Sequence, residues 1–512
     1  MNLGVLDWFV IAAFMVGTLW LAHGVRGAQT NLSEYFLASR ALSWVTVGLC
    51  LYATLFSTVS FVAIPGEAYK NGVLFSINSI GYALFTPLAV WMFLRFAYNT
   101  SAFTAYEYLE HRFSRPVRVL GALVFLVARS LYMAVVFYSA AKIFQTLLGW
   151  SPWMTIGAVG LFTIYYSYHG GMKAIALTDA AMSVIIFGAI AFIVIKLCVL
   201  IGFDFGGMWG AVRETGRGYE VMATPEFYSF DPQVRYSFWT ALVLAILGPL
   251  MNYGTDQLFV QRMLSTKTYA AAKQAIWLKT LVAVPVSLAL YGIGVLMFYY
   301  YERVTTNAPA VPPDQMLGYF INEHMPSPMP GFVAAALLAA LMSTVSSTAA
   351  SLATVTSIDI MAFIPSLRRW TGEQSVQAGK VLTILWGLVS MALAMALIYA
   401  GRGVETTVLE VSQVWAGLWL ILLAVVMGGI FTRWVTARAA VAALVTGILC
   451  NLAAPYFLYY RVPADERISF VWVGMPGFLI TLLVLALVSA LDPRKQTSLK
   501  GLTIQTVDRT RL

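Results

Sequence analysis

Long apolar runs separated by short polar stretches dominate this chain. A helix needs roughly 20 apolar residues to cross the hydrocarbon core of a bilayer, and about thirteen runs are near or above that length. They are residues 5–24, 41–69, 73–98, 118–148, 151–169, 174–201, 236–262, 274–301, 330–360, 377–400, 407–430, 436–457 and 469–491. Several runs are longer than a helix needs to cross the bilayer without tilt, which indicates tilted helices or breaks within a helix. The pattern predicts an all-α polytopic membrane protein whose residues 1–512 form a single membrane domain.

The composition excludes an ordinary soluble protein. Of the 512 residues, 60% are hydrophobic and 11% are charged, and the mean hydropathy is +0.77, whereas a soluble domain has about 25% charged residues. The three cysteines, Cys50, Cys198 and Cys450, lie within apolar runs and form no close pair, so neither a disulfide framework nor a metal site is expected. No cluster of acids, bases or metal ligands occurs at one depth, and we therefore expect neither a cofactor nor an enzyme.

The basic residues are concentrated in alternate loops, and this distribution predicts the orientation. The net charge is +9, and the richest loops include one that holds Arg112, Arg115 and Arg118. Because cytoplasmic loops carry the excess of Lys and Arg, we expect the N-terminus outside and the tail 492–512 in the cytoplasm. Topology explains the positive charge without a nucleic-acid partner. The expected location is the plasma (inner) membrane, in a multi-pass arrangement within the lipid bilayer, with the oligomeric state left open and a monomer allowed.

Two membrane runs carry clusters of hydroxyl residues. The sequence ATLFSTVS occupies 53–60, within the run 41–69, and STVSST occupies 343–348, within the run 330–360. A helix broken at the first cluster would expose backbone carbonyls that can bind a small cation. Hydroxyls on one face of the second run would supply further oxygen ligands. The alternative is that these hydroxyls bond to the helix backbone or allow close helix packing.

Two charged residues lie inside membrane runs, where an ionisable group needs a partner. Asp179 lies a few residues into the run 174–201, and its candidate partners are a bound cation, a proton, Lys173 and Arg129. Arg129 lies roughly 16 Å into the run 118–148 if that run is helical. Its guanidinium can bind a carboxylate in bidentate fashion. The expected partner of Arg129 is therefore either a substrate carboxylate or Asp179.

Several short motifs resemble those of the sodium:solute symporter family. They are EYFLASR at 34–40, AFTAYEYLEHRF at 102–113, GGMKA at 170–174 followed by Thr178-Asp179, DQLFVQR at 256–262, and the serine-rich segment 343–348. Each motif alone is weak, but they follow the family order over about 300 residues. Among the branches, the sequence is most similar to the iodide, monocarboxylate and multivitamin transporters. The bacterial sialic acid symporters are a near second.

The resemblance implies a LeuT-like fold built from two inverted repeats of five helices. The repeats would cover 41–201 and 236–430, and each would begin with a broken helix that faces a site near the membrane midplane. The run 5–24 would be an extra N-terminal helix, and 436–491 would hold two helices after the second repeat.

The resemblance also implies two sodium sites. By position, the family's principal sodium site corresponds to Ala53, Phe56, Ala340, Ser343 and Thr344. A second site, which occurs only in some members, corresponds to Asp179, Ser343, Ser346 and Ser347. All the residue types that the second site needs are present, so two coupled sodium ions are expected.

The candidate substrate-binding residues are polar or aromatic and belong to the same midplane region. They are Ser57, Ser60, Phe75, Asn78, Ser79, Tyr82, Arg129, Tyr132, Asn252 and Gln413; for Gln413 a structural role is the alternative. Sugar transporters of the family carry Gln and Glu where this chain has Ser60 and Ser79, which disfavours a galactose-type substrate. Sialic acid symporters carry an arginine at the position of Tyr132, whereas Arg129 lies one helical turn earlier.

The motifs and the polar residues together predict a sodium-coupled secondary active symporter. It would import a small organic solute that bears a carboxylate, by alternating access. A symporter of sugar or another neutral solute is the alternative within the class. A channel or a transporter-like sensor is the alternative outside it, although only about 20 polar residues follow Asp492, too few for a signalling domain.

Overall fold

The computed structural model describes residues 3–25, 29–99, 102–365, 370–400, 416–463, 466–492, 499 and 501–506. The described residues form a helical bundle, in which the only β-pairing is an isolated bridge between Leu42 and Thr266. The helices are α1 Val5–Gly24, α2 Leu32–Leu37, α3 Trp44–Leu55, α4 Thr58–Asn71, α5 Ile77–Ala89, α6 Arg95–Asn99, α7 Glu107–Arg112, α8 Arg115–Leu148, α9 Pro152–Leu200, α10 Phe205–Glu214, α11 Phe238–Gly254, α12 Gln257–Leu264, α13 Tyr269–Tyr299, α14 Pro313–His324, α15 Met329–Val355, α16 Gly372–Ala400, α18 Gly417–Phe431, α19 Ala437–Pro455 and α20 Met475–Leu491. The predicted all-α class is confirmed.

Two of the predicted membrane runs are broken near the middle of the bundle. Helices α3 and α4 meet at an angle of 59°, and α11 and α12 at 58°. At the first break Phe56 and Ser57 have extended backbones. At the second, Asp256 is extended and its side chain accepts a hydrogen bond from the backbone N–H of Leu258. The runs 41–69 and 236–262 are therefore broken, as the resemblance predicts.

Helix α9 changes direction at a glycine. A continuous helix of 49 residues would be about 74 Å long, more than twice the hydrocarbon thickness of about 30 Å. Gly171 interrupts it with φ 57° and ψ −164°, and a Cβ at this position would lie 2.9 Å from the carbonyl oxygen of Tyr35. An L-residue rarely takes this conformation, so glycine fits the junction. The interruption agrees with the separate runs predicted at 151–169 and 174–201.

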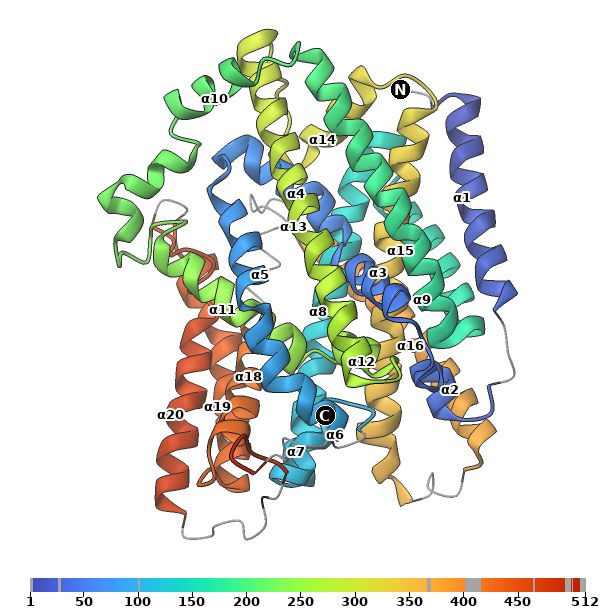
Figure 1. Ribbon diagram of the computed structural model, residues 1–512, viewed down its shortest axis with the longest axis vertical. Coiled ribbons are helices and arrows are strands. Elements are labelled where there is room, and N and C mark those ends of the chain that lie inside the picture. Colours follow the sequence, from blue (N-terminus) through green and yellow to red (C-terminus); the bar gives the residue numbers. More distant parts are fainter. Residues whose placement is uncertain are drawn as a thin grey trace.

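Helix α15 is the centre of the bundle. In the span Met329–Phe363, 94% of the most apolar window is buried, compared with 28% in the span Val5–Gly24. Small residues make up most of α15, and α1, α8, α9 and α16 pack against it (Figure 1). Small side chains allow such close packing of membrane helices. The hydroxyls of α15 are therefore enclosed by protein instead of facing lipid.

Different helices lie at the two ends of the bundle. The N-terminus lies at the same end as the loop helices α10 and α14, and α7 lies at the opposite end (Figure 1). Helices α19 and α20 pack against each other and against α18, at the edge opposite α1 (Figure 1). This arrangement leaves α3, α8, α9, α13 and α15 around the middle of the molecule.

The number of membrane crossings stays a prediction. In the described residues, eight helices are long and apolar enough to cross a bilayer, or ten if each bent pair is one span, and α18 and α20 are shorter apolar helices. The division into repeats at 41–201 and 236–430 and the tail at 492–512 are also predictions that the helix bounds alone do not test.

Candidate functional site

The break between α3 and α4 leaves backbone oxygens available inside the bundle. Ala53 is buried in the last turn of α3, and Phe56 follows the end of that helix. In the described part of the chain, no hydrogen-bond donor reaches the carbonyl oxygens of Ala53 and Phe56. Buried carbonyls almost always have a partner. At an unwound membrane helix, free carbonyls can coordinate a cation.

Helix α15 presents hydroxyls next to this break. The Oγ1 of Thr54 lies 3.3 Å from the Oγ of Ser347, which joins the two helices. Ser343 is fully buried, and its hydroxyl has no partner among the described residues. The hydroxyl of Thr344 donates to the carbonyl oxygen of Ala340 at 3.0 Å, as the helix-packing alternative predicts. The residues of the predicted first sodium site thus come from two helices that contact each other. Among them, the hydroxyl oxygen of Ser343 forms no hydrogen bond with the described residues.

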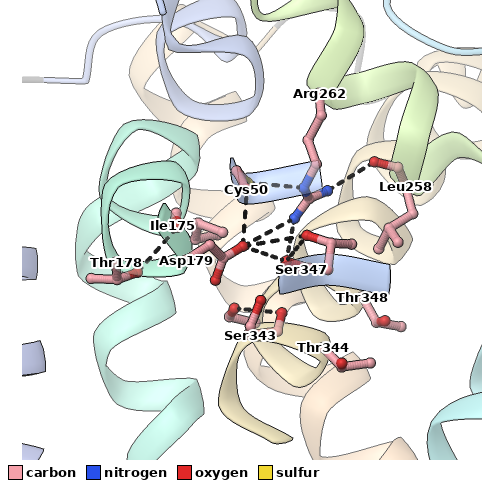
Figure 2. Close-up of polar contacts among 12 residues, drawn as sticks. Cys50, Ile175, Thr178, Asp179, Leu258, Arg262, Ser343, Thr344, Ser347 and Thr348 are labelled. Atoms are coloured by element: carbon pink, nitrogen blue, oxygen red, sulfur yellow. Dashed lines mark hydrogen bonds and ion pairs between the residues drawn. The ribbon is translucent and has the colours of Figure 1, made fainter. Parts of the chain in front are cut away.

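Asp179 is the centre of a second polar group (Figure 2). Helix α9 carries this residue, and its side chain is fully buried. Its Oδ2 accepts hydrogen bonds from the hydroxyl of Ser347 at 3.1 Å, the hydroxyl of Thr54 at 3.4 Å and the thiol of Cys50 at 3.3 Å. Its Oδ1 has no partner within the described ranges. The carboxylate thus links α9 to both α3 and α15.

The remaining residues of the predicted second sodium site lie on the same face of α15. The hydroxyl of Ser346 donates to the carbonyl oxygen of Ser343 at 3.1 Å, and its oxygen can still offer a lone pair to a cation while this bond is kept. Among the four residues of this predicted site, the side-chain oxygens without a hydrogen-bond partner in the described residues are Oδ1 of Asp179 and Oγ of Ser343. Oxygen-only ligands of this kind suit a hard cation.

Arg262 supplies the positive charge that faces Asp179. It lies near the end of α12, and its Nη2 is 3.8 Å from the Oδ2 of Asp179. Its Nε donates to the sulfur of Cys50 at 3.2 Å, and its Nη2 also donates to the hydroxyl of Ser347. Its Nη1 donates to the carbonyl oxygen of Leu258 at 2.8 Å (Figure 2). The guanidinium on α12 therefore balances the negative charge of the carboxylate on α9.

Two partners that the sequence suggests for Asp179 are wrong. The side chain of Lys173 is exposed, and Arg129 forms a buried ion pair with Asp256. Sequence reasoning missed Arg262 because it lies far from Asp179 along the chain and belongs to a motif at the expected inner end of a run. The signal was the arginine at the end of DQLFVQR, a motif already singled out by resemblance.

A cavity of ≈ 430 Å³ lies beside the first break. Small-molecule sites commonly occupy about 300–1,000 Å³. Eight of the predicted substrate residues line it, namely Ser60, Phe75, Asn78, Ser79, Tyr82, Arg129, Tyr132 and Asn252. Ser57 is not among the lining residues; it is buried, with its hydroxyl 3.4 Å from that of Tyr132. Gln413 lies outside the described residues.

Arg129 has a protein carboxylate as its partner. It forms an ion pair with Asp256, and the two residues are 5% and 4% exposed. The other carboxylate oxygen of Asp256 accepts from the N–H of Leu258 at 3.0 Å. The guanidinium also lies 5.3 Å from the ring centre of Tyr132 and 5.2 Å from that of Trp419. Asp256 is not among the partners predicted for Arg129, and the pair leaves no net charge on this wall of the cavity.

A second cation on the cavity wall was not singled out from the sequence. Lys279 belongs to α13, lines the cavity and is 2% exposed. The signal was present, because Lys279 is the only Lys, Arg, Asp or Glu in the run 274–301.

The chain is similar in sequence and in fold to known membrane transporters. The family model described as the sodium:solute symporter family matches residues 35–447. The chain is 27% identical over 486 residues to a putative sodium-dependent multivitamin transporter of Drosophila melanogaster, covering 91% of this chain and 77% of that one. It is 29% identical over 478 residues to sodium-coupled monocarboxylate transporter 2 of Bos taurus, covering 91% and 75%. A solved structure of a Na⁺-coupled sialic acid symporter, 20% identical, superposes with a TM-score of 0.82 over 97% of this chain and 100% of that one.

Proposed function

Because the chain belongs to the sodium:solute symporter family, we propose that it uses the inward sodium gradient to import a small carboxylate through the cavity beside the broken helix. It is a multi-pass membrane transporter, and sodium is its coupling ion. The observation that carries the proposal is the break between α3 and α4, where two carbonyls lack a donor among the described residues and where Thr54 contacts the hydroxyl of Ser347 on α15. The relatives named for monocarboxylates and vitamins support a substrate with a carboxylate.

Sodium binds at two neighbouring places in this proposal. The first ion is held by the carbonyls of Ala53, Phe56 and Ala340 and by the hydroxyls of Ser343 and Thr344. The lack of donors to the first two carbonyls supports this assignment. The second ion is held by Asp179, Ser343, Ser346 and Ser347, and the free Oδ1 of Asp179 supports it. Ser343 is common to both sets.

Arg262 acts as the counter-ion of Asp179 when sodium is absent. Its guanidinium lies 3.8 Å from the carboxylate, so a sodium ion at the second site competes with it for the same negative charge. Arg262 belongs to α12, the second half of a broken span. Its release on sodium binding would free that half to move, and this links the ion to the conformation that opens or closes the cavity.

Coupling follows from the shared position of the ions and the cavity. Thr54 lines the cavity and also contacts Asp179 and Ser347. An ion that orders the break therefore orders one wall of the substrate cavity, and the substrate in turn favours the ion to the same extent. Each sodium charge that enters down 100 mV contributes about 2.3 kcal/mol to uptake.

The N-terminus lies outside and the C-terminus in the cytoplasm in this proposal. The distribution of Lys and Arg among the loops supports that orientation. The N-terminus lies at the end of the bundle opposite α7 (Figure 1). Arg112 ends α7 and Arg115 begins α8, so the placement of these basic residues is consistent with the proposed orientation.

Electrical recording on reconstituted liposomes tests the function. Butyrate, lactate and benzoate are added in sodium and, separately, in choline. We expect an inward current that saturates with acid concentration and requires sodium. A current that is equal in choline, or that never saturates, would show that the chain is not a sodium-coupled symporter for these acids.

A further inference from the structure

Lys279 has no anionic partner in the described part of the chain. It lies ten residues into α13, which begins at Tyr269, and so about 15 Å from the helix start. Its side chain is 2% exposed and lines the cavity. Among the described residues no hydrogen bond or ion pair reaches its ammonium. An unpaired cation at membrane depth is costly, and such groups generally face a cavity or a ligand pathway.

Aromatic and amide groups surround this ammonium. The Nζ of Lys279 lies 4.3 Å from the ring centre of Tyr82 and 5.7 Å from that of Tyr253. The amide of Asn252 donates to the hydroxyl of Tyr82 at 2.9 Å, which fixes that ring. Ring faces attract an ammonium, yet they accept none of its three N–H bonds in the way a carboxylate does. The amine of Lys279 is thus positioned by rings and has no carboxylate partner in the described part of the chain.

The other charges on the cavity wall cancel each other. Among the described lining residues, the remaining charged groups are Arg129 and Asp256, and these two form an ion pair. A protonated Lys279 therefore gives the cavity one net positive charge. A neutral solute would leave this charge unpaired, whereas an anion would neutralise it.

We infer that the ammonium of Lys279 binds the anionic group of the transported solute and selects acids over their neutral analogues. This inference rests on the function proposed above, and it identifies Lys279 as the residue that recognises the anionic group of the substrate. The carboxylate of a small monocarboxylic acid accepts hydrogen bonds from the ammonium. Its body occupies the rest of the cavity, where Phe75, Tyr132 and Trp419 offer aromatic surface. The role that the sequence suggested for Arg129 thus belongs to Lys279.

Acid and amide pairs test the assignment on the purified full chain. Thermal stabilisation is measured with butyrate and butyramide, lactate and lactamide, and benzoate and benzamide, each in sodium and in choline. The proteins are wild type, Lys279→Gln, Lys279→Arg and Lys273→Gln. Lys273 is the matched control because it lies on the same helix with an exposed side chain. Stabilisation by sodium alone reports whether each variant folds with intact ion sites.

We expect acids to stabilise the wild type in sodium and the amides to have no effect. Lys279→Gln should weaken apparent acid affinity about ten- to hundredfold, the worth of one charged hydrogen-bonded contact. Lys279→Arg should recover part of this loss, Lys273→Gln should behave as the wild type, and sodium alone should stabilise all four proteins. The inference is overturned if Lys279→Gln keeps wild-type affinity, or if acid and amide stabilise the wild type equally. Acid binding that depends on Lys279 but is equal in choline would instead contradict the sodium coupling and leave the Lys279 assignment standing.

Discussion

The guanidinium of Arg262 lies 3.8 Å from the carboxylate of Asp179, and neither side chain is more than 1% exposed. The two residues come from α12 and α9, and the hydroxyl of Ser347 on α15 contacts both of them. Three helices thus meet at a single buried charge pair. Sodium at the second proposed site has to share the carboxylate with this guanidinium or displace it.

Arg262→Met should make the protein more dependent on sodium. The sodium-free variant keeps a buried carboxylate without its cation, and breaking a buried pair costs about 3–5 kcal/mol. Sodium can then take the place of the guanidinium, so its stabilising effect should exceed that in the wild type. The measurement is the melting temperature of purified protein across a sodium titration at constant ionic strength. The Asp179→Asn and Arg262→Met double variant is the control, because it removes both charges. An equal sodium effect in Arg262→Met and the wild type would show that the guanidinium and the ion do not compete.

Arg129→Gln should destabilise the protein more than it changes acid affinity. Its guanidinium forms a buried ion pair with Asp256, and loss of one partner leaves the other charge buried, at a cost of about 3–5 kcal/mol. Adding Asp256→Asn should recover a large part of that cost in a double-mutant cycle. The measurements are the unfolding free energy and the acid affinity of Arg129→Gln, Asp256→Asn and the double variant, each compared with the wild type. A selective loss of acid affinity with unchanged stability would restore Arg129 as the substrate-binding cation.

Ser343→Ala should weaken sodium binding, because its hydroxyl belongs to both proposed ion sites and has no partner within the described residues. The expected loss of apparent sodium affinity is about tenfold, the worth of one contact to a charged group. Ser351→Ala is the matched control on α15, since that hydroxyl already donates to the carbonyl oxygen of Thr348 at 2.9 Å. Sodium-dependent melting compares the two. If both variants respond to sodium alike, Ser343 is not a ligand.

Gly171→Ala should destabilise the junction in α9. Its φ of 57° and ψ of −164° disfavour an L-residue, and a Cβ would lie 2.9 Å from the carbonyl oxygen of Tyr35. Strain of this kind costs about 1–3 kcal/mol. Gly157→Ala on the same helix is the control, because no atom lies within 4 Å of a Cβ placed there. Unfolding of both variants in one detergent measures the difference, and equal stability would mean that the backbone at Gly171 adapts.

Local patterns predicted the helices and the first break well. The hydroxyl cluster around Ser57 lies where α3 ends and α4 begins, because a run that is too long for a bilayer and rich in helix-competing hydroxyls favours an interruption. The two runs on either side of Gly171 were separable for a similar reason. These features depend on residues close together in the sequence.

The pairing of charges could not be predicted in the same way. Arg262 reaches Asp179, and Arg129 reaches Asp256, only because the helices that carry them cross in the folded bundle. Each of these residues had other partners of opposite charge at a comparable expected depth. Lys279 is the opposite case. A single lysine in an apolar run is visible in the sequence, but its lack of an ion-pair partner among the described residues depends on which helices pack around it.

The number of sodium ions bound shows whether Asp179 is a sodium ligand. Stabilisation of purified protein is measured against sodium concentration at constant ionic strength, and the slope of the unfolding free energy against the logarithm of sodium concentration gives that number. We expect a slope for about two ions in the wild type and for about one in Asp179→Asn, because only the second site uses the carboxylate. A wild-type slope that Asp179→Asn leaves unchanged would contradict the assignment of Asp179 as a sodium ligand.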